Sequence, residues 1–227
     1  MDLQQINWIA YADDMVLNTD TDYVFKINVE KYYNLVEEEY LNLLSADELV
    51  KANRFIQLAD KQRFVTGRHF LRHIIARKFD KFNAEILFKY TEFNKPYLDG
   101  IEFNIAHSGN YVLVAISNSL IGADIEFMNN SFDHTDIMYE IFNTNEVAYI
   151  NNAQTEALNF YTLWTRKEAL LKATGEGLTD DLKIIDCLGD VVERSQAQYT
   201  LISFRINDDY MAALASTANN NLLFFKL

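Results

Sequence analysis

Cysteine, long apolar runs and basic residues are scarce in this sequence, and each shortage excludes a class of protein. Cys187 is the only cysteine, which excludes an intramolecular disulfide and a metal site built from several cysteines. No apolar run reaches the ~18 residues needed to span a bilayer, and the first residues lack the basic and apolar regions of a signal peptide. We therefore expect a cytoplasmic protein without a membrane-spanning segment.

The shortage of basic residues bears on binding partners. The chain has 20 Lys and Arg against 33 Asp and Glu, a net charge of −13. Nucleic-acid binding depends on clustered Lys and Arg that displace counterions from phosphates, so the charge argues against a general nucleic-acid-binding protein. A local basic pocket for a small anion remains compatible with this charge. With 49% hydrophobic and 23% charged residues, the chain has the composition of a globular protein.

Hydrophobic periodicity predicts two similar halves, each with short helices, one long helix and a run of strands. The long helices are predicted at residues 59–79 and 156–174, and Ser45 and Glu48 form a capping-box pattern that begins a short helix. Strands are predicted at residues 6–11, 23–28, 86–90, 101–106, 111–117, 121–127, 184–187, 199–206, 210–216 and 222–225, and further helices at 30–44, 133–142 and 145–151. We therefore predict an α+β duplication, with one half at residues 1–119 and the other at 120–227.

Two carboxylates share one face of the strand predicted at residues 121–127. Because side chains alternate along a strand, Asp124 and Glu126 point the same way, and apolar residues point the other way. Like charges on one face repel each other unless solvent or a cation neutralises them. A solvent-facing strand is one interpretation. The other is a site for a hard divalent cation such as Mg²⁺, with Glu168 as a third carboxylate.

Two lysines accompany Glu168 on the second long helix. Lys167 falls inside the apolar arc of this helix, and Glu168 and Lys172 lie on its border. A buried ammonium must either extend to solvent or meet an anion, because an unpaired buried charge is very unfavourable. The alternative is a surface Glu/Lys pair, which stabilises a helix by about a few tenths of a kcal/mol. Lysines beside a metal site fit phosphoryl chemistry.

Two other sequence patterns do not indicate a functional site. His69 and His73 have the spacing of helical zinc ligands, but Phe70 stands where a zinc protease needs its Glu, and we interpret the pair as structural. No glycine-rich phosphate-binding loop is present, so a nucleotide would have to be bound in another way.

Four stretches resemble, in order and at similar separations, the motifs of the 4′-phosphopantetheinyl transferases. The similarity is greater to the two-domain class typified by the surfactin synthetase-activating enzyme. The stretches are Asp60-Lys61-Gln62-Arg63 with Gly67 and Arg72; Asn94-Lys95-Pro96-Tyr97 through Phe103-Asn104-Ile105-Ala106-His107-Ser108-Gly109; Gly122-Ala123-Asp124-Ile125-Glu126; and Trp164-Thr165-Arg166-Lys167-Glu168-Ala169-Leu170-Leu171-Lys172, continuing to Leu178.

The resemblance implies an enzyme that moves the phosphopantetheine arm of coenzyme A (CoA) onto a serine of an apo acyl, peptidyl or aryl carrier protein and releases 3′,5′-ADP. By position, Asp124, Glu126 and Glu168 would hold Mg²⁺. Glu168, directly or through a water, would take the serine proton, and Lys172 would stabilise charge on the leaving phosphate. Asp124, Glu168 and Lys172 would thus be the catalytic residues.

The resemblance also implies the residues that bind CoA. Arg63 and His107 match positions that hold the 3′-phosphate, Lys95 matches one that lines the nucleotide pocket with Pro96 beside it, and Lys167 and Lys172 would face the phosphates. Glu48 departs from the pattern, because relatives often carry a lysine there, and this departure leaves Lys51 and Arg54 to serve. We expect a monomer with CoA bound between the halves.

Residues 127–155 match the region where relatives of this family contact the carrier protein. This segment contains no Lys or Arg but offers large apolar residues, among them Phe127, Met128, Phe132, Ile137, Met138, Ile141 and Phe142. We expect some of them to be core and a few to form an apolar docking surface. Two other functions stay open, a metal-dependent nuclease, against which the net charge counts, and a non-catalytic CoA-binding module.

Overall fold

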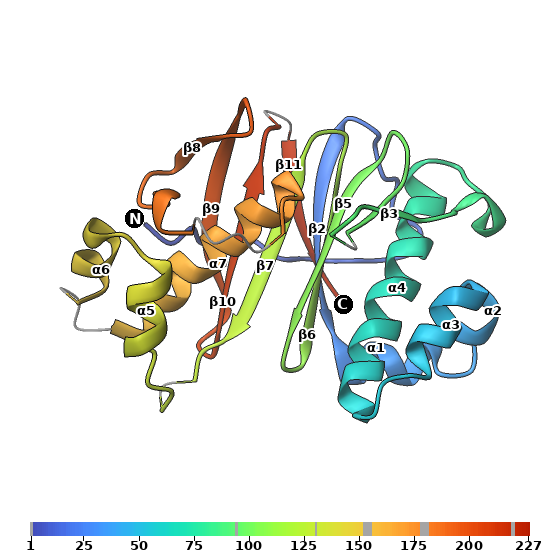
Figure 1. The fold of residues 1–227 in the computed structure, drawn as a ribbon. Helices are drawn as coiled ribbons and strands as arrows, with labels where there is room; N and C mark the ends of the chain where they lie inside the picture. Colours follow the sequence, from blue (N-terminus) through green and yellow to red (C-terminus); the bar gives the residue numbers. More distant parts are fainter. Residues whose placement is uncertain (1, 94, 130, 152–155, 178–181, 219–220) are drawn as a thin grey trace. The chain divides into compact units, whose positions relative to one another are not determined.

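The computed structural model describes residues 2–93, 95–129, 131–151, 156–177, 182–218 and 221–227. They form two compact units. The N-terminal unit consists of Asn7–Asn118 with Asn220–Leu227, and the C-terminal unit consists of Ser119–Asn219 with Met1–Ile6. Each unit contains one large sheet and one long helix (Figure 1). Within the described residues, no helix is both long and apolar enough to cross a membrane.

The sheet of the N-terminal unit has the strand order β1-β11-β2-β6-β5. Its strands are β1 (Ile9–Ala10), β2 (Thr21–Asn28), β5 (Glu102–Ser108), β6 (Tyr111–Ser117) and β11 (Asn221–Lys226). The helices are α1 (Val29–Val36), α2 (Tyr40–Leu43), α3 (Ala46–Ala52) and α4 (Leu58–Lys78), with a 3₁₀ turn at Asn83–Glu85 and a small ladder of β3 (Lys89–Tyr90) and β4 (Pro96–Tyr97). The core lies where the apolar side of α4 meets the buried side chains of β2 and β6.

The sheet of the C-terminal unit has the strand order β7-β10-β9-β8, and every neighbouring pair is antiparallel. Its strands are β7 (Ile121–Phe127), β8 (Val191–Arg194), β9 (Ala197–Asn207) and β10 (Tyr210–Ser216). The helices are α5 (Thr135–Ile141), α6 (Thr144–Asn151) and α7 (Glu156–Thr174), with a 3₁₀ turn at Leu182–Ile184. Helix α7 packs over β7 and β10, and its apolar side chains form the centre of the core.

The two units repeat one connection pattern. In each, a first strand is followed by short helices, one long helix and then an antiparallel hairpin whose second strand pairs with the first strand. The resulting order is β2-β6-β5 in one unit and β7-β10-β9 in the other. The predicted α+β duplication is therefore confirmed at the level of topology.

Several predicted elements differ from the structure. The helix predicted at residues 30–44 is two helices, because the chain turns where Glu39 N donates to Val36 O, three residues back. The strand predicted at 184–187 is wrong, since Ile184 ends a 3₁₀ turn and Ile185 O accepts a hydrogen bond from Lys167 on α7 instead of from a neighbouring strand. Strand β8 was not predicted. The last strand, β11, pairs with β2, so residues 220–227 belong to the N-terminal unit and not to the half predicted at 120–227.

Candidate active site

A cluster of carboxylates and one lysine lies where β7 faces α7 in the C-terminal unit. Asp124 on β7 is only 3% exposed. Its Oδ1 accepts a hydrogen bond of 2.5 Å from Lys172 Nζ on α7. Its Oδ2 is buried and has no hydrogen-bond partner among the described residues. Glu126 Oε1, two residues along the strand, accepts a 3.4 Å hydrogen bond from Trp164 Nε1. Strand and helix thus bring together side chains that lie far apart in the sequence.

Gly122 allows α7 to lie directly against β7. A Cβ atom at this position would be 2.1 Å from Ala169 O and 2.4 Å from Ala173 N, distances that real side chains do not adopt. The turn of α7 between these two alanines carries Lys172 and follows Glu168. Only glycine permits this approach of backbone to backbone. In the sequence, Gly122 stands out only as part of a motif, and no local pattern indicates this packing role.

The carboxylates raise one another's proton affinity. Burial raises the pKa of Asp124 to about 7, with Glu126 and Glu168 adding to the effect and Lys172 opposing it. Burial also raises the pKa of Glu168, with Lys172 opposing and Glu126 adding. For Lys172, burial favours the neutral amine, but the three carboxylates outweigh burial and raise its pKa. The cluster therefore holds more negative charge than the ammonium of Lys172 neutralises.

The donor set of this cluster fits a hard cation, although no ready-made metal site is formed. Across the described ranges, no group of three or more His, Cys, Asp or Glu side chains is arranged to hold a metal ion. The Lys172 ammonium is the cation that contacts Asp124 here. The unpartnered Asp124 Oδ2 and the surplus of negative charge are nevertheless what an oxygen-liganded ion such as Mg²⁺ would satisfy.

Lys167 requires a correction, because the structure does not present it to a ligand. Its side chain is fully buried, and Nζ lies 2.9 Å from Glu146 Oε2 on α6. Nζ also donates to Leu182 O at 2.8 Å and to Ile185 O. Glu146 is fully buried as well, and its Oε1 accepts from Cys187 N at 2.9 Å. The anion that a lysine in the apolar arc requires is thus a protein carboxylate, and Lys167 is not available to phosphates.

A second site, a basic pocket of about 200 Å³, lies in the N-terminal unit. Its lining comes from α3, α4, the start of β4 and the strand β5: Lys51, Arg63, Phe64, Arg68, Lys95, Pro96, Phe103, Asn104, Ile105 and His107. Five of the predicted CoA-binding residues, Lys51, Arg63, Lys95, Pro96 and His107, therefore line a single pocket. Asn94, which precedes Lys95 in the motif, lies outside the described residues.

The electrostatics of the basic pocket favour an anion. Burial lowers the pKa of Lys51, and the neighbouring Arg68 lowers it further. Burial lowers the pKa of Lys95 as well, with Glu102 opposing. Arg63 is held in place by Asp60 at 2.5 Å and by Gly109 O at 2.9 Å. Because desolvation penalises these cations, an anion that enters the pocket would restore the stability of their charged forms.

Glu48 does not line the pocket, although it stands where a basic residue was expected. It completes the predicted capping box: Ser45 N donates to Glu48 Oε2 at 2.9 Å, and Glu48 N donates to Ser45 Oγ at 3.3 Å. The same Oε2 accepts a 2.7 Å hydrogen bond from Arg72 Nε. Arg68, for which no role was predicted from the sequence, lines the pocket instead. Its one sequence signal is its position one helical turn after Phe64.

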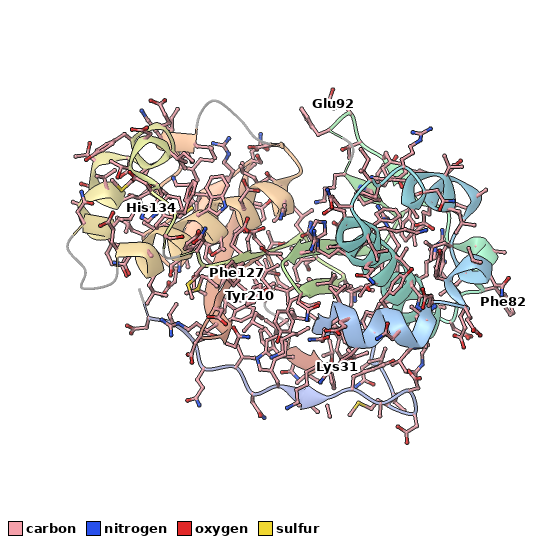
Figure 2. The ribbon with its side chains drawn as sticks, turned by 90° about the horizontal axis from the view of Figure 1, so that it is seen from below. Lys31, Phe82, Glu92, Phe127, His134 and Tyr210 are labelled. Carbon is pink, nitrogen blue, oxygen red and sulfur yellow. The ribbon has the colours of Figure 1, made fainter. Side chains whose placement is uncertain are left out.

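The predicted docking segment divides into core and surface. Met128, Met138, Ile141 and Phe142 belong to the core of the C-terminal unit. Phe127, Phe132, Ile137 and the additional Tyr139 are between 40 and 53% exposed. Phe127 packs edge to face on Tyr210 of the neighbouring strand, with ring centroids 5.2 Å apart (Figure 2). The last residues of the segment, 152–155, lie outside the described residues.

Comparisons with known proteins match both parts of the chain to one family. Residues 120–215 match a family model described as the 4′-phosphopantetheinyl transferase superfamily, and residues 36–119 match one described as 4′-phosphopantetheinyl transferase, N-terminal. A Synechocystis sp. protein, whose name assigns it provisionally to these transferases, is 34% identical over 201 residues, 79% of this chain and 82% of that protein. The 4′-phosphopantetheinyl transferase HetI of Nostoc sp. is 28% identical over 93% of this chain and 94% of its own length. Sfp of Bacillus subtilis is 30% identical over 63% of this chain and 65% of its own.

Proposed function

This chain belongs to the 4′-phosphopantetheinyl transferase superfamily and is an enzyme of that type, and on this premise we propose CoA as its donor and an apo carrier protein as its acceptor. The observation that carries the proposal is the pair of sites: a basic pocket suited to a phosphate in one unit, and a carboxylate and lysine cluster suited to phosphoryl transfer in the other.

The proposed reaction is a displacement at phosphorus. The serine oxygen of the carrier protein forms a bond to the phosphorus that bears the pantetheine arm. The bond from this phosphorus to the bridging oxygen breaks, and 3′,5′-ADP leaves with that oxygen. Glu168 accepts the serine proton, directly or through a water, and its raised pKa makes it a stronger base than an ordinary carboxylate. Lys172 keeps its proton, because the carboxylates raise its pKa, and it stabilises charge on the departing oxygen.

In this proposal, Asp124, Glu126 and Glu168 hold Mg²⁺. The ion would neutralise charge on the pyrophosphate when bound. Support comes from the buried Oδ2 of Asp124, which has no hydrogen-bond partner in the described part of the chain, and from the surplus negative charge of the cluster. Transfer should be abolished by EDTA and restored by added Mg²⁺. Full transfer in EDTA would contradict the assignment of the metal.

The proposal is tested by incubating the enzyme with CoA, Mg²⁺ and a panel of apo acyl, peptidyl and aryl carrier domains, read by intact mass. One carrier should gain the mass of a phosphopantetheine group. Glu168→Gln should lose turnover, while Glu193→Gln, an exposed glutamate of the same unit on β8, should keep it. A panel in which no carrier gains mass would contradict the proposed acceptor class.

Variants of the two sites should affect different steady-state parameters. Lys51→Ala in the basic pocket should raise KM for CoA, because a phosphate contact is present both before and during the reaction. Lys172→Ala should depress kcat with only a modest change in KM, because its contact strengthens as the leaving oxygen gains charge. A change in KM alone for Lys172→Ala would assign uniform binding to Lys172 instead.

A further inference from the structure

One arginine in the basic pocket is buried without a hydrogen-bond partner for one of its terminal nitrogens among the described residues. Arg68 on α4 is only 6% exposed. Its Nη1 is buried without a hydrogen-bond partner among the described residues. The nearest opposite charge is Glu48, whose Oε1 lies 3.9 Å from Nη1, too far for a hydrogen bond, and this oxygen also has no partner there. A guanidinium has five N–H donors, and leaving a buried one unsatisfied destabilises the folded state.

Arg72, one turn further along α4, shows what a structural arginine looks like in this helix. Its Nε donates to Glu48 Oε2 at 2.7 Å. Its Nη1 donates to Asn83 Oδ1 at 3.0 Å and to Ile86 O at 3.1 Å. Glu48 is therefore already paired with Arg72 and with the backbone of Ser45. Arg68 makes a longer contact with Glu48, 3.9 Å from Nη1 to Oε1. Arg72 therefore binds Glu48 by a hydrogen bond, and Arg68 does not.

The surroundings of Arg68 hold its guanidinium in position without satisfying it. The guanidinium carbon lies 5.2 Å from the ring centroid of Phe88, 5.8 Å from that of Phe64 and 6.0 Å from that of Tyr90. Aromatic faces of this kind orient the planar group and leave its in-plane donors for an acceptor. Since Arg68 lines the pocket with Lys51 and Lys95, the acceptor that fits is an anion with several oxygens, and a phosphate matches the guanidinium fork.

We propose that Arg68 binds the 3′-phosphate of CoA in the basic pocket and that it makes the enzyme select donors that carry this phosphate. Arg68 would take the role of the basic residue that was expected at position 48, where this chain has a glutamate. The inference rests on the proposed function, because it takes CoA as the donor. The phosphate completes the hydrogen bonds of Arg68, and Glu48 remains with Arg72. Arg68 is a binding residue in this assignment and takes no part in the transfer step.

The experiment compares two nucleotides by calorimetry: adenosine 3′,5′-bisphosphate, which carries the 3′-phosphate, and adenosine 5′-monophosphate, which lacks it. Their affinity ratio for the wild-type protein measures how much the 3′-phosphate contributes. Arg68→Met keeps the length of the side chain and removes its charge, and Arg68→Lys keeps the charge and removes the fork. Arg77→Met is the matched control, because Arg77 lies on the same helix but contacts Tyr11 and Met15 O.

The ratio should fall roughly tenfold to a hundredfold in Arg68→Met, the range expected for charge-assisted hydrogen bonds, and by less in Arg68→Lys. Arg77→Met should keep the wild-type ratio. If Arg68→Met does not fold, Arg68→Lys carries the same comparison. A wild-type ratio in the folded Arg68 variants would overturn the inference and leave the proposed function standing. A wild-type protein that binds neither nucleotide would overturn the proposed function itself.

Discussion

Replacing Asp124 by Asn should make the protein more stable at alkaline pH and inactive in transfer. Burial, with Glu126 and Glu168 adding to it, raises the pKa of Asp124 from its ordinary value of 3.8 to about 7 in spite of Lys172. The folded state therefore binds this proton more tightly than the unfolded chain does. The stabilising contribution of the protonated group is fully present below about pH 4 and is lost as the pH rises to about 7.

The size of the effect follows from the same pKa. A difference of about three pH units, at about 1.36 kcal/mol each, corresponds to a loss of about 4 kcal/mol by pH 8. Asparagine has no charge to bury and avoids this loss, but it gives up the ion pair with Lys172, whose side chain is 32% exposed and stays near Glu168. We therefore expect a net gain of about 1–3 kcal/mol at pH 8 and almost none at pH 4.5.

The measurement is urea unfolding of both proteins at pH 4.5, 6 and 8 in EDTA, followed by circular dichroism. Asp208→Asn is the control, because Asp208 is fully exposed in the turn between β9 and β10. It should show no dependence on pH of this kind. If Asp124→Asn were less stable than the wild type by the same amount at every pH, the Asp124–Lys172 pair would be a net stabilising contact and the reasoning would be refuted.

Three further predictions concern the same unit. Gly122→Ala should reduce transfer more than tenfold by pushing α7 away from β7, because the added Cβ would meet backbone atoms at 2.1 and 2.4 Å. Gly189→Ala is its control, because a Cβ at that position meets nothing nearer than 3.5 Å. In the proposed metal site, protons would compete with Mg²⁺ for Asp124, whose pKa is about 7. The Mg²⁺ concentration for half-maximal activity should therefore rise toward tenfold per pH unit below pH 7, and a constant value between pH 6 and 8 would contradict this competition. Transfer rates at saturating CoA should hold steady or rise from low to moderate ionic strength, because the exposed residues Phe127, Phe132 and Ile137 lie in a predicted docking segment without Lys or Arg. A steep fall in the rate would indicate that the carrier protein docks on a basic patch elsewhere.

The elements with strong local patterns could be predicted from the sequence. Helix α7 and the strands β6, β7 and β10 have the predicted bounds, because each has a clear hydrophobic period and turn residues at its ends. The capping box of Ser45 and Glu48 is also as predicted, since it depends only on residues three apart. The carboxylates and Lys172 could be selected as a group because a strand face and a helix border each limit where a side chain points.

Contacts set by tertiary packing could not be predicted in this way. Strand β11 joins the N-terminal unit by pairing with β2, about two hundred residues earlier in the chain, and no local pattern encodes that pairing. The different duties of Arg68 and Arg72 depend on which of them reaches Glu48 Oε2. Lys167 was correctly expected to need an anion, but its partner Glu146 lies on another helix, and only the packing of α6 on α7 brings the two together.

This last contact leads to a test that separates a structural lysine from a phosphate-binding one. Lys167→Met would leave Glu146 buried with two backbone donors from the described part of the chain, Asn143 N and Cys187 N. Removing one partner of a buried ion pair costs about 3–5 kcal/mol, so the free energy of unfolding should fall by about that amount. The double variant Lys167→Met with Glu146→Gln removes both charges, and much of the loss should be recovered. The folded fraction of either variant should keep the wild-type KM for CoA, because Lys167 meets carbonyl groups and a carboxylate inside the core. A single variant with wild-type stability and a raised KM would show that Lys167 binds the phosphates after all.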